Sequence, residues 1–380
     1  MNITERTNLL LKIRRNVGVL MATMLLTILN LVMTSELSAQ QSNKVERVEG
    51  QADNDSPLKY KFGGLLQIWT FGADRYDKYI TSNADTKTSF LIKRAEIALS
   101  GSILDGAIFF TFMTDIARYP NSYTETGDRK SLPTQDLFIE YRAIPFINIK
   151  IGQFLKPITM ESDQPSGDLF FIRRAMHTGG GTFAGNIAGT VQYGDQRDIG
   201  IMLNYQFGRK GSTIFEYKLG IFQGDSQNIG ESNEHKSIAG KINLMLFEKI
   251  LKFGISGQRD TSAEATNRDD RAGGHLLIHV AGLTAAFEYM QGWDMGSANT
   301  GIYGALLYDF KDSLSLPLQP GFRIDYFYKD DIDKNDLVKI YTFGLNYSIA
   351  DQHARLQLNY MYVEDTTIGH QVALNTQISF

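Results

Sequence analysis

Alternation of apolar and polar residues, over segments about ten residues long, constrains the fold of this chain more than any other feature. In the stretch 198–207, every second residue is apolar or aromatic: Ile199, Ile201, Leu203, Tyr205 and Phe207. The same alternation recurs near 320–328, 354–364 and 370–380. Because successive side chains of a β-strand point to opposite sides, each segment predicts a strand with one apolar and one polar face.

The length of these segments distinguishes two kinds of β-protein. A strand that crosses a bilayer needs about 9–11 residues, with one face in lipid and the other in a wet lumen. Strands of soluble sandwiches are typically about five or six residues long. Only 43% of the residues are hydrophobic, although 23 are Phe and 18 are Tyr, which suits strands that are apolar on one side. The sequence therefore predicts an all-β fold, a transmembrane antiparallel β-barrel.

We expect about sixteen spanning strands, joined alternately by tight turns on one side of the membrane and longer loops on the other. They are expected near residues 60–71, 90–103, 106–115, 134–142, 147–154, 198–207, 212–222, 237–247, 250–259, 271–281, 283–293, 300–310, 320–328, 338–349, 354–364 and 370–380. The alternation holds only if 155–197 is a single connection, so the weakly strand-like stretch 183–193 is not counted. The connection 311–319 is long for the side with tight turns.

The connection 155–197 is therefore the third external loop, and it is far longer than the others. It contains Pro157, Pro165 and the apolar cluster Phe170–Ile172. A long loop without regular structure of its own is commonly functional, and apolar side chains are poorly placed in water. We expect this loop to fold into the lumen, pack on the inner wall and form the constriction of a pore.

The first 39 residues have the order of a secretory signal peptide. Arg14 and Arg15 precede an apolar run at 17–32, and Leu37–Ala39 provides the small residues of a cleavage site. A single N-terminal membrane helix is the alternative. The polar residues 40–58 predict a flexible lead-in, and residues 59–380 predict the barrel. Export of a barrel predicts location in the bacterial outer membrane, with outer-membrane lipid around it.

Charge and residue types argue against several classes of function. Removal of residues 1–39 takes away four of the 38 basic residues and two of the 42 acidic ones, which leaves an acidic excess of six. An acidic balance offers no footprint for nucleic acid. Cysteine is absent, and His275 and His279, four residues apart on a strand, lie about 13 Å apart along it. We therefore expect no disulfide, no metal site and no cofactor.

Strand parity assigns a set of basic residues to the inner face of the barrel. A charged side chain on the lipid face near the membrane midplane costs about 2–4 kcal/mol for Arg or Lys, which favours the inward assignment. The expected lumen-wall residues are Arg94, Arg142, Lys150, Lys218, Lys241, Lys252, Arg323 and Arg355.

Three basic residues of the constriction loop are candidates for an anion-facing set at the pore. They are Lys156, Arg173 and Arg174. A pore selects by its diameter and by the sign of the charges that line it, so these residues predict a preference for anions. The alternative is that the arginines pin the loop by pairing with wall carboxylates, for which the candidates are Glu96, Asp136 and Glu140.

A group of motifs between Lys93 and Gly224 carries a family resemblance. They are Lys93-Arg94-Ala95-Glu96, Asp136 with Glu140-Tyr141-Arg142, Gly152-Gln153-Phe154 with Pro157 and Glu161, Phe171-Ile172-Arg173-Arg174-Ala175, and Gly220-Ile221-Phe222-Gln223-Gly224. Together they resemble the phosphate-selective porin O and P family, and the terminal Phe380 resembles the signal that outer-membrane barrels carry for insertion. The resemblance implies a sixteen-stranded, usually trimeric outer-membrane porin whose third loop folds inward and whose basic lumen residues guide anions. One departure is that basic and acidic residues balance within 155–197.

These observations predict an outer-membrane porin that lets small hydrophilic solutes diffuse passively. The expected solutes are small anionic or polar molecules, with phosphate among the anions, and the expected assembly is a homotrimer without enzymatic activity. A structural or adhesive barrel is one alternative. A barrel-embedded hydrolase is another, and it would need Ser, His and an acidic or amide residue at one membrane depth on neighbouring strands. The sequence offers no such arrangement.

Overall fold

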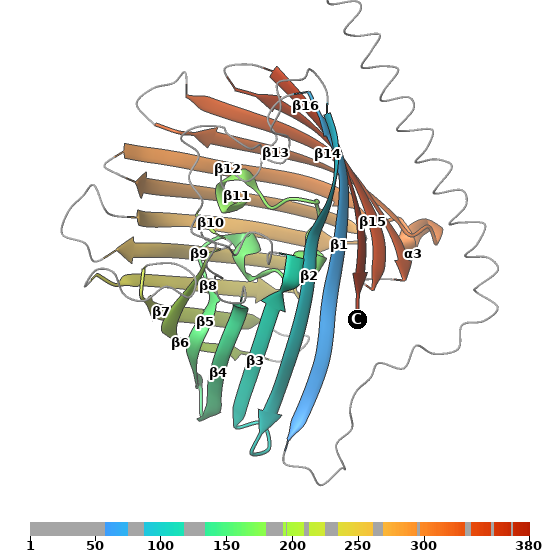
Figure 1. Ribbon diagram of the computed structural model, residues 1–380. Helices are drawn as coiled ribbons and strands as arrows, with labels where there is room; N and C mark the ends of the chain where they lie inside the picture. The colour runs from blue at the N-terminus through green and yellow to red at the C-terminus, as the bar shows by residue number, and fades with distance from the viewer. Residues whose placement is uncertain are drawn as a thin grey trace, which may run out of the picture. The chain divides into compact units, whose positions relative to one another are not determined.

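The chain forms a closed antiparallel β-barrel in the computed structural model, which describes residues 58–74, 87–117, 134–179, 193–194, 196–208, 213–224, 235–260, 269–294, 297–330, 336–350, 353–365 and 368–380. Each strand pairs with its neighbours in the sequence, and β1 pairs with β16 to close the ring (Figure 1). The expected fold class is confirmed. Within the described residues, no helix is both long and apolar enough to cross a membrane.

The sixteen strands lie close to the expected ranges. They are β1 (Lys59–Ala73), β2 (Lys87–Ile103), β3 (Ile108–Asp115), β4 (Thr134–Ile144), β5 (Ile147–Leu155), β6 (Arg197–Phe207), β7 (Ile214–Phe222), β8 (Ser237–Leu246), β9 (Leu251–Asp260), β10 (Asp269–Val280), β11 (Leu283–Asp294), β12 (Ser297–Tyr308), β13 (Leu318–Tyr328), β14 (Leu337–Ala350), β15 (Ala354–Glu364) and β16 (Ile368–Ser379). The predicted signal peptide and nearly all of the predicted lead-in lie outside the described residues.

Two faces of the strands differ as the alternation requires. Large apolar side chains remain exposed at every second position in the middle of the strands; examples are Ile151, Ile201, Ile221, Phe287, Leu306 and Phe343. Polar and charged side chains at the positions between them are almost fully buried; examples are Lys241, Glu288, Arg323, Gln357 and Asn375. We call the first set the outer face and the second the inner face. An apolar outer face on a barrel without open edges is the arrangement that lipid requires.

The last residue of the sequence extends the pairing that closes the ring. The backbone N–H of Gly64 donates to the carbonyl of Phe380 (2.9 Å), and the N–H of Phe380 donates to the carbonyl of Gly64 (3.1 Å). A Cβ at position 64 would lie 2.6 Å from the Phe380 ring. Glycine at position 64 therefore lets the terminal aromatic ring pack directly on β1.

Two connections differ from the sequence expectation. The long stretch between β12 and β13 contains a short helix, α3 (Lys311–Leu314), which ends where Ser315 adopts a left-handed conformation with φ of 55°. This helix accounts for a long connection on the side with tight turns. The other difference is at 294–299, which was expected as a loop: β11 runs to Asp294 and β12 begins at Ser297. Pairing of Asp294 with Ser297 makes this connection a tight hairpin.

A lysine on the outer face tests the assignment of faces. Ile201 lies near the middle of β6 with 53% of its surface exposed, so Ile201→Lys is expected to destabilise the barrel in phospholipid bilayers by about 2–4 kcal/mol. Gln206→Lys, on the inner face of the same strand, is the control and should cost about 1 kcal/mol or less, because its side chain does not enter lipid. Denaturant unfolding of both variants in lipid vesicles measures the difference. Equal losses would contradict the assignment.

Candidate functional site

Residues 156–179, between β5 and β6, form a buried segment that we call the loop segment. It contains three short helices, η3 (Met160–Asp163), η4 (Ser166–Asp168) and α2 (Met176–Gly179), and it is drawn in green in Figure 1. Most of its residues are buried. Its backbone belongs to no strand ladder, so its N–H and carbonyl groups need other partners. Side chains of the inner face provide many of them.

Amide and guanidinium groups of the last strands and of β1 hold the middle of the loop segment, residues 166–172. They donate hydrogen bonds of 2.9–3.3 Å to the carbonyls of Ser166, Gly167, Leu169 and Phe170. The side-chain oxygen of Asn359 accepts from the N–H of Ile172 (2.8 Å). Each bond satisfies a backbone group that burial would otherwise leave without water. The donors are Gln67, Asn346, Arg355, Gln357 and Gln377.

Charged groups of β11 and β13 hold the part of the loop segment that follows, residues 173–177. His177 Nε2 lies 2.8 Å from the Glu288 carboxylate, and both side chains are almost fully buried. Asp325 accepts from the N–H of Met176 (2.9 Å) and forms a buried ion pair with Arg323 (2.7 Å). Arg323 also donates to the carbonyl of Arg173 (2.7 Å). Removing one partner of such a buried pair leaves an uncompensated charge, which makes this contact costly to break.

Glycines of the inner face make room for the bulky side chains of the loop segment. Phe171 is 1% exposed and lies where a Cβ on Gly344 would be 2.9 Å from its ring, and a Cβ on Gly321 3.3 Å from it. His177 occupies the corresponding space beside Gly301, where a Cβ would be 2.4 Å away. The loop segment and the wall therefore fit each other in shape as well as in hydrogen bonding.

Two carboxylates of the loop segment have pKa values shifted in opposite directions. Burial raises the pKa of Glu161 from its ordinary 4.5, although Arg323, the N–H of Ala175 and Arg174 act against the rise. Burial also acts to raise the pKa of Asp163, but two nearby lysines outweigh it and lower that pKa well below its ordinary 3.8. The ionised form is thus favoured at Asp163 and disfavoured at Glu161.

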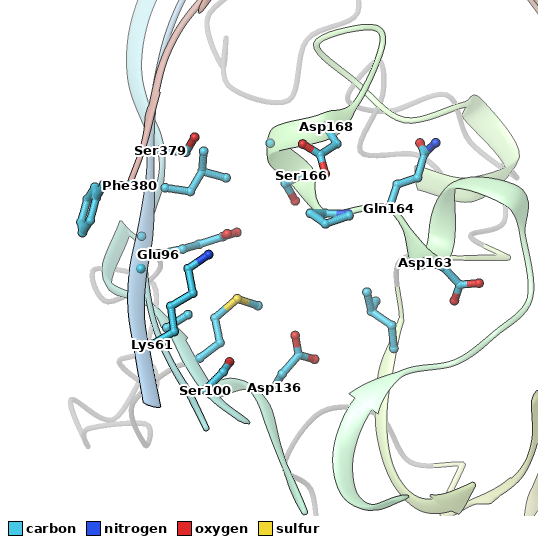
Figure 2. A pocket seen from close by; sticks show the side chains of 18 of the residues that line it. Lys61, Glu96, Ser100, Asp136, Asp163, Gln164, Ser166, Asp168, Ser379 and Phe380 are labelled. Atoms are coloured by element: carbon cyan, nitrogen blue, oxygen red, sulfur yellow. The ribbon is translucent and has the colours of Figure 1, made fainter. Parts of the chain in front are cut away.

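A cavity of about 450 Å³ separates the loop segment from the opposite wall. Figure 2 shows Lys61, Glu96 and Ser379 on one side, and Ser166 and Asp168 of the loop segment across from them. Strands β1 to β4 contribute much of its lining on the wall side. The charged groups that line it are the acids Glu96, Asp136, Asp163 and Asp168 and the bases Lys61, Arg174 and Arg197.

Of the three residues predicted to face anions, Arg174 lines the cavity. Its guanidinium donates to the carbonyls of Glu161 and Gln164, the latter at 2.9 Å. Arg173 lies over the ring of Trp69 with its guanidinium carbon 5.5 Å from the ring centre, and the Lys156 side chain is buried. Neither of these two is among the residues that line the cavity. The hydrogen bonds of Arg174 fit the alternative in which an arginine holds the loop in place. Its partners are backbone carbonyls, whereas that alternative named wall carboxylates.

The wall carboxylates named in that alternative pair with arginines of the strands. Arg94 lies 3.3 Å from Glu96, and Arg197, the first residue of β6, lies 2.9 Å from Asp136. Glu140 pairs with Arg142. Because Arg197 belongs to β6, the connection between the strands ends at residue 196.

The predicted lumen-wall residues show a range of burial. Arg94, Lys241, Arg323 and Arg355 are almost fully buried. Lys150, Lys218 and Lys252 are half-buried, and Arg142 is exposed. The roles predicted for these eight residues in the pore stay predictions.

Sequence reasoning missed the uncharged amides that hold the loop segment. They occupy inner-face positions on β1 and on three of the last strands: Gln67, Asn346, Gln357, Asn359 and Gln377. The sequence prediction named only charged residues on this face. The available signal was the excess of Asn and Gln at alternate positions of 346–377. Among the described residues, no group of three or more His, Cys, Asp or Glu side chains is arranged to hold a metal ion.

Comparison with known proteins shows similarity in fold. No family model matches the sequence, and no curated protein matches it. Solved structures with a similar fold include an anion-selective porin from Comamonas acidovorans, with 13% identity, a TM-score of 0.58, and coverage of 85% of this chain and 100% of that one. The outer membrane channel DcaP of Acinetobacter baumannii has 12% identity, a TM-score of 0.57, and coverage of 87% and 99%. Salmonella typhi OmpF in complex with daunomycin has 12% identity, a TM-score of 0.59, and coverage of 87% and 99%. The chain thus has the general porin fold, and its resemblance to the phosphate-selective family stays a prediction.

Filling the glycine space beside Phe171 tests the fit of the loop segment. Gly344→Val is expected to displace the Phe171 ring and weaken docking by about 1–3 kcal/mol, as overpacking does in cores. Hydrogen–deuterium exchange of peptides covering 166–179 should become faster. Gly304→Val on the outer face is the control, because a Cβ there meets no atom within 4 Å. Unchanged exchange in Gly344→Val would show that the fit does not hold the loop segment.

The raised pKa of Glu161 gives a stability effect that depends on pH. The folded protein binds the Glu161 proton more tightly than the unfolded chain does. The contribution of Glu161 to the free energy of unfolding is therefore most favourable below about pH 4.5, and it is lost as the pH rises through the raised pKa. Glu161→Gln keeps an oxygen that can accept from the N–H of Ala175 and removes the charge. The gain in unfolding free energy of Glu161→Gln over wild type should therefore grow from pH 4.5 to pH 8, measured by denaturant titration. A constant difference would contradict the prediction.

Proposed function

We propose that the protein is a passive diffusion channel for small hydrophilic solutes in the bacterial outer membrane. The observation that carries the proposal is the cavity between the loop segment and the wall of β1 to β4, inside a closed barrel with an apolar outer face. We propose that the loop segment is the constriction of the pore and that solutes pass through this cavity. The porin fold of the structural neighbours supports this reading, and it requires no catalytic group.

A preference for anions, with phosphate among them, is the finer part of this proposal. The eight basic residues predicted for the inner face support it, because charges of one sign in a narrow cleft raise the local concentration of counter-ions. The charges that line the cavity itself include four acids and three bases, so we expect the preference to be weak. One structural neighbour is named an anion-selective porin, which agrees with a preference for anions over cations.

Location and assembly are proposals of the same kind. The apolar outer face and the predicted signal peptide support insertion into the outer membrane after export. A homotrimer is proposed from the family resemblance. A structural or adhesive barrel would bind a surface without conducting ions, and a barrel-embedded hydrolase would act on phospholipid. Conductance distinguishes the channel from both alternatives.

Planar-bilayer recording of the purified protein tests the proposed function. We expect stepwise single-channel currents, and in a salt gradient a reversal potential on the anion side of zero. Arg174→Ala should increase single-channel conductance, because the Arg174 guanidinium holds the loop carbonyls of Glu161 and Gln164. The reversal potential of Arg173→Ala measures whether Arg173 contributes to selectivity. Absence of channels from properly assembled protein would overturn the function, and a reversal potential on the cation side would overturn the anion preference.

A further inference from the structure

Two lysines of the inner face stand directly opposite each other on adjacent strands. Lys218 of β7 pairs with Lys241 of β8 in the strand register. Like charges in directly opposed positions destabilise a sheet. The carboxylate of Asp163, from the loop segment, lies against both: its Oδ2 is 3.0 Å from Lys218 Nζ and 2.8 Å from Lys241 Nζ. Asp163 therefore acts as the counter-ion that lets the two lysines coexist.

The geometry of this contact is that of an anion site. One carboxylate oxygen accepts from two ammonium groups, and Lys241, whose side chain is 1% exposed, also donates to the carbonyl of Thr159 (2.6 Å). Charge-assisted hydrogen bonds of this length are among the stronger polar contacts in proteins. A phosphate or carboxylate solute presents oxygens of the same kind.

Asp163 is the member of this cluster that lines the cavity, and in Figure 2 its carboxylate points away from Glu96 and Lys61. Lys218 and Lys241 are not among the lining residues. The side chains of Asp163 and Lys218 are 23% and 19% exposed, and that of Lys241 is 1% exposed. A solute in the cavity therefore has to displace the Asp163 carboxylate to reach the lysine pair.

Two carboxylates lie beside the lysine pair. Asp163 is one, and Glu216 is a second acidic partner of Lys218, at 3.5 Å, with Asn243 donating to Glu216 (2.6 Å). Lys150 and Lys252 are close enough to interact electrostatically with the same groups and add positive charge. Loss of the Asp163 charge would therefore leave a further positive charge unbalanced beside the cavity.

We propose that Lys218 and Lys241 form an oxyanion-binding site whose present occupant is the carboxylate of Asp163, and that Asp163 thereby limits the anion selectivity of the channel. The proposal rests on the proposed channel function and names a residue that sets its selectivity. The tethered carboxylate competes with any solute oxyanion, because its local concentration near the lysines is high. The class of ligand is a small oxyanion, for which inorganic phosphate is the probe.

Asp163→Asn tests the proposal, because the amide has nearly the same shape without the charge. In bilayers with a potassium chloride gradient, the ratio of anion to cation permeability should rise roughly tenfold, at the low end of the effect of charge in a narrow cleft. In potassium phosphate, the conductance of Asp163→Asn should saturate at a lower concentration than that of wild type. Lys218→Met should shift the ratio the other way, and Asp163→Asn with Lys218→Met should return it close to wild type.

The outcomes separate a selectivity site from a structural contact. If Asp163 only held the loop segment, Asp163→Asn would raise single-channel conductance and leave the permeability ratio and phosphate saturation unchanged, which would overturn the proposal. A double variant that keeps the full shift of Asp163→Asn would also overturn it, because the lysine pair would then not be the site. If wild type forms no channels at all, the proposed function fails; if wild type conducts and the variants do not shift, only this inference fails.

Discussion

The need to satisfy backbone hydrogen bonds without water governs both parts of this structure. Closure of the ring gives the strands their partners, because β1 pairs with β16 and no edge remains. The loop segment has no ladder, and a buried carbonyl without a partner costs about 1–3 kcal/mol. Inner-face residues such as Gln357 and Asn346 donate to its carbonyls instead. Many polar side chains of the inner face therefore form hydrogen bonds with the backbone of the loop segment.

The parts of the fold that depend on local pattern could be predicted from the sequence. Alternation with period two identifies strands, and the order of short and long connections keeps their number even, which is why sixteen strands could be placed to within a few residues. The helix α3 was missed because four residues are too few for a helical period to show. The pairing of Asp294 with Ser297 was also missed, because 294–299 was expected to be a longer loop.

The candidate site depends on partners that are far apart in the chain, and this is why sequence reasoning reached it only in outline. Nothing near Phe171 indicates that its ring fits against Gly321 and Gly344. Strand parity could place a charge on the inner face, but it could not say which carboxylate would lie beside which amine. Arg174 illustrates the limit: its position on the loop was read as exposure to anions, and its guanidinium bonds two loop carbonyls. The inward position of the whole connection 156–196 stays a prediction, since residues 180–192 and 195 lie outside the described ranges.

The distance along the chain between the loop segment and its partners has a consequence for the order of assembly. Leu169 and Phe170 are bonded to Arg355 and Asn346, which follow more than 170 residues later in the chain. Most strands that hold the loop segment follow it in the chain, and contacts of such long sequence separation form late because the intervening chain must first be ordered. Docking of the loop segment therefore has to wait for the last strands, and it cannot be complete before β14, β15 and β16 are in place.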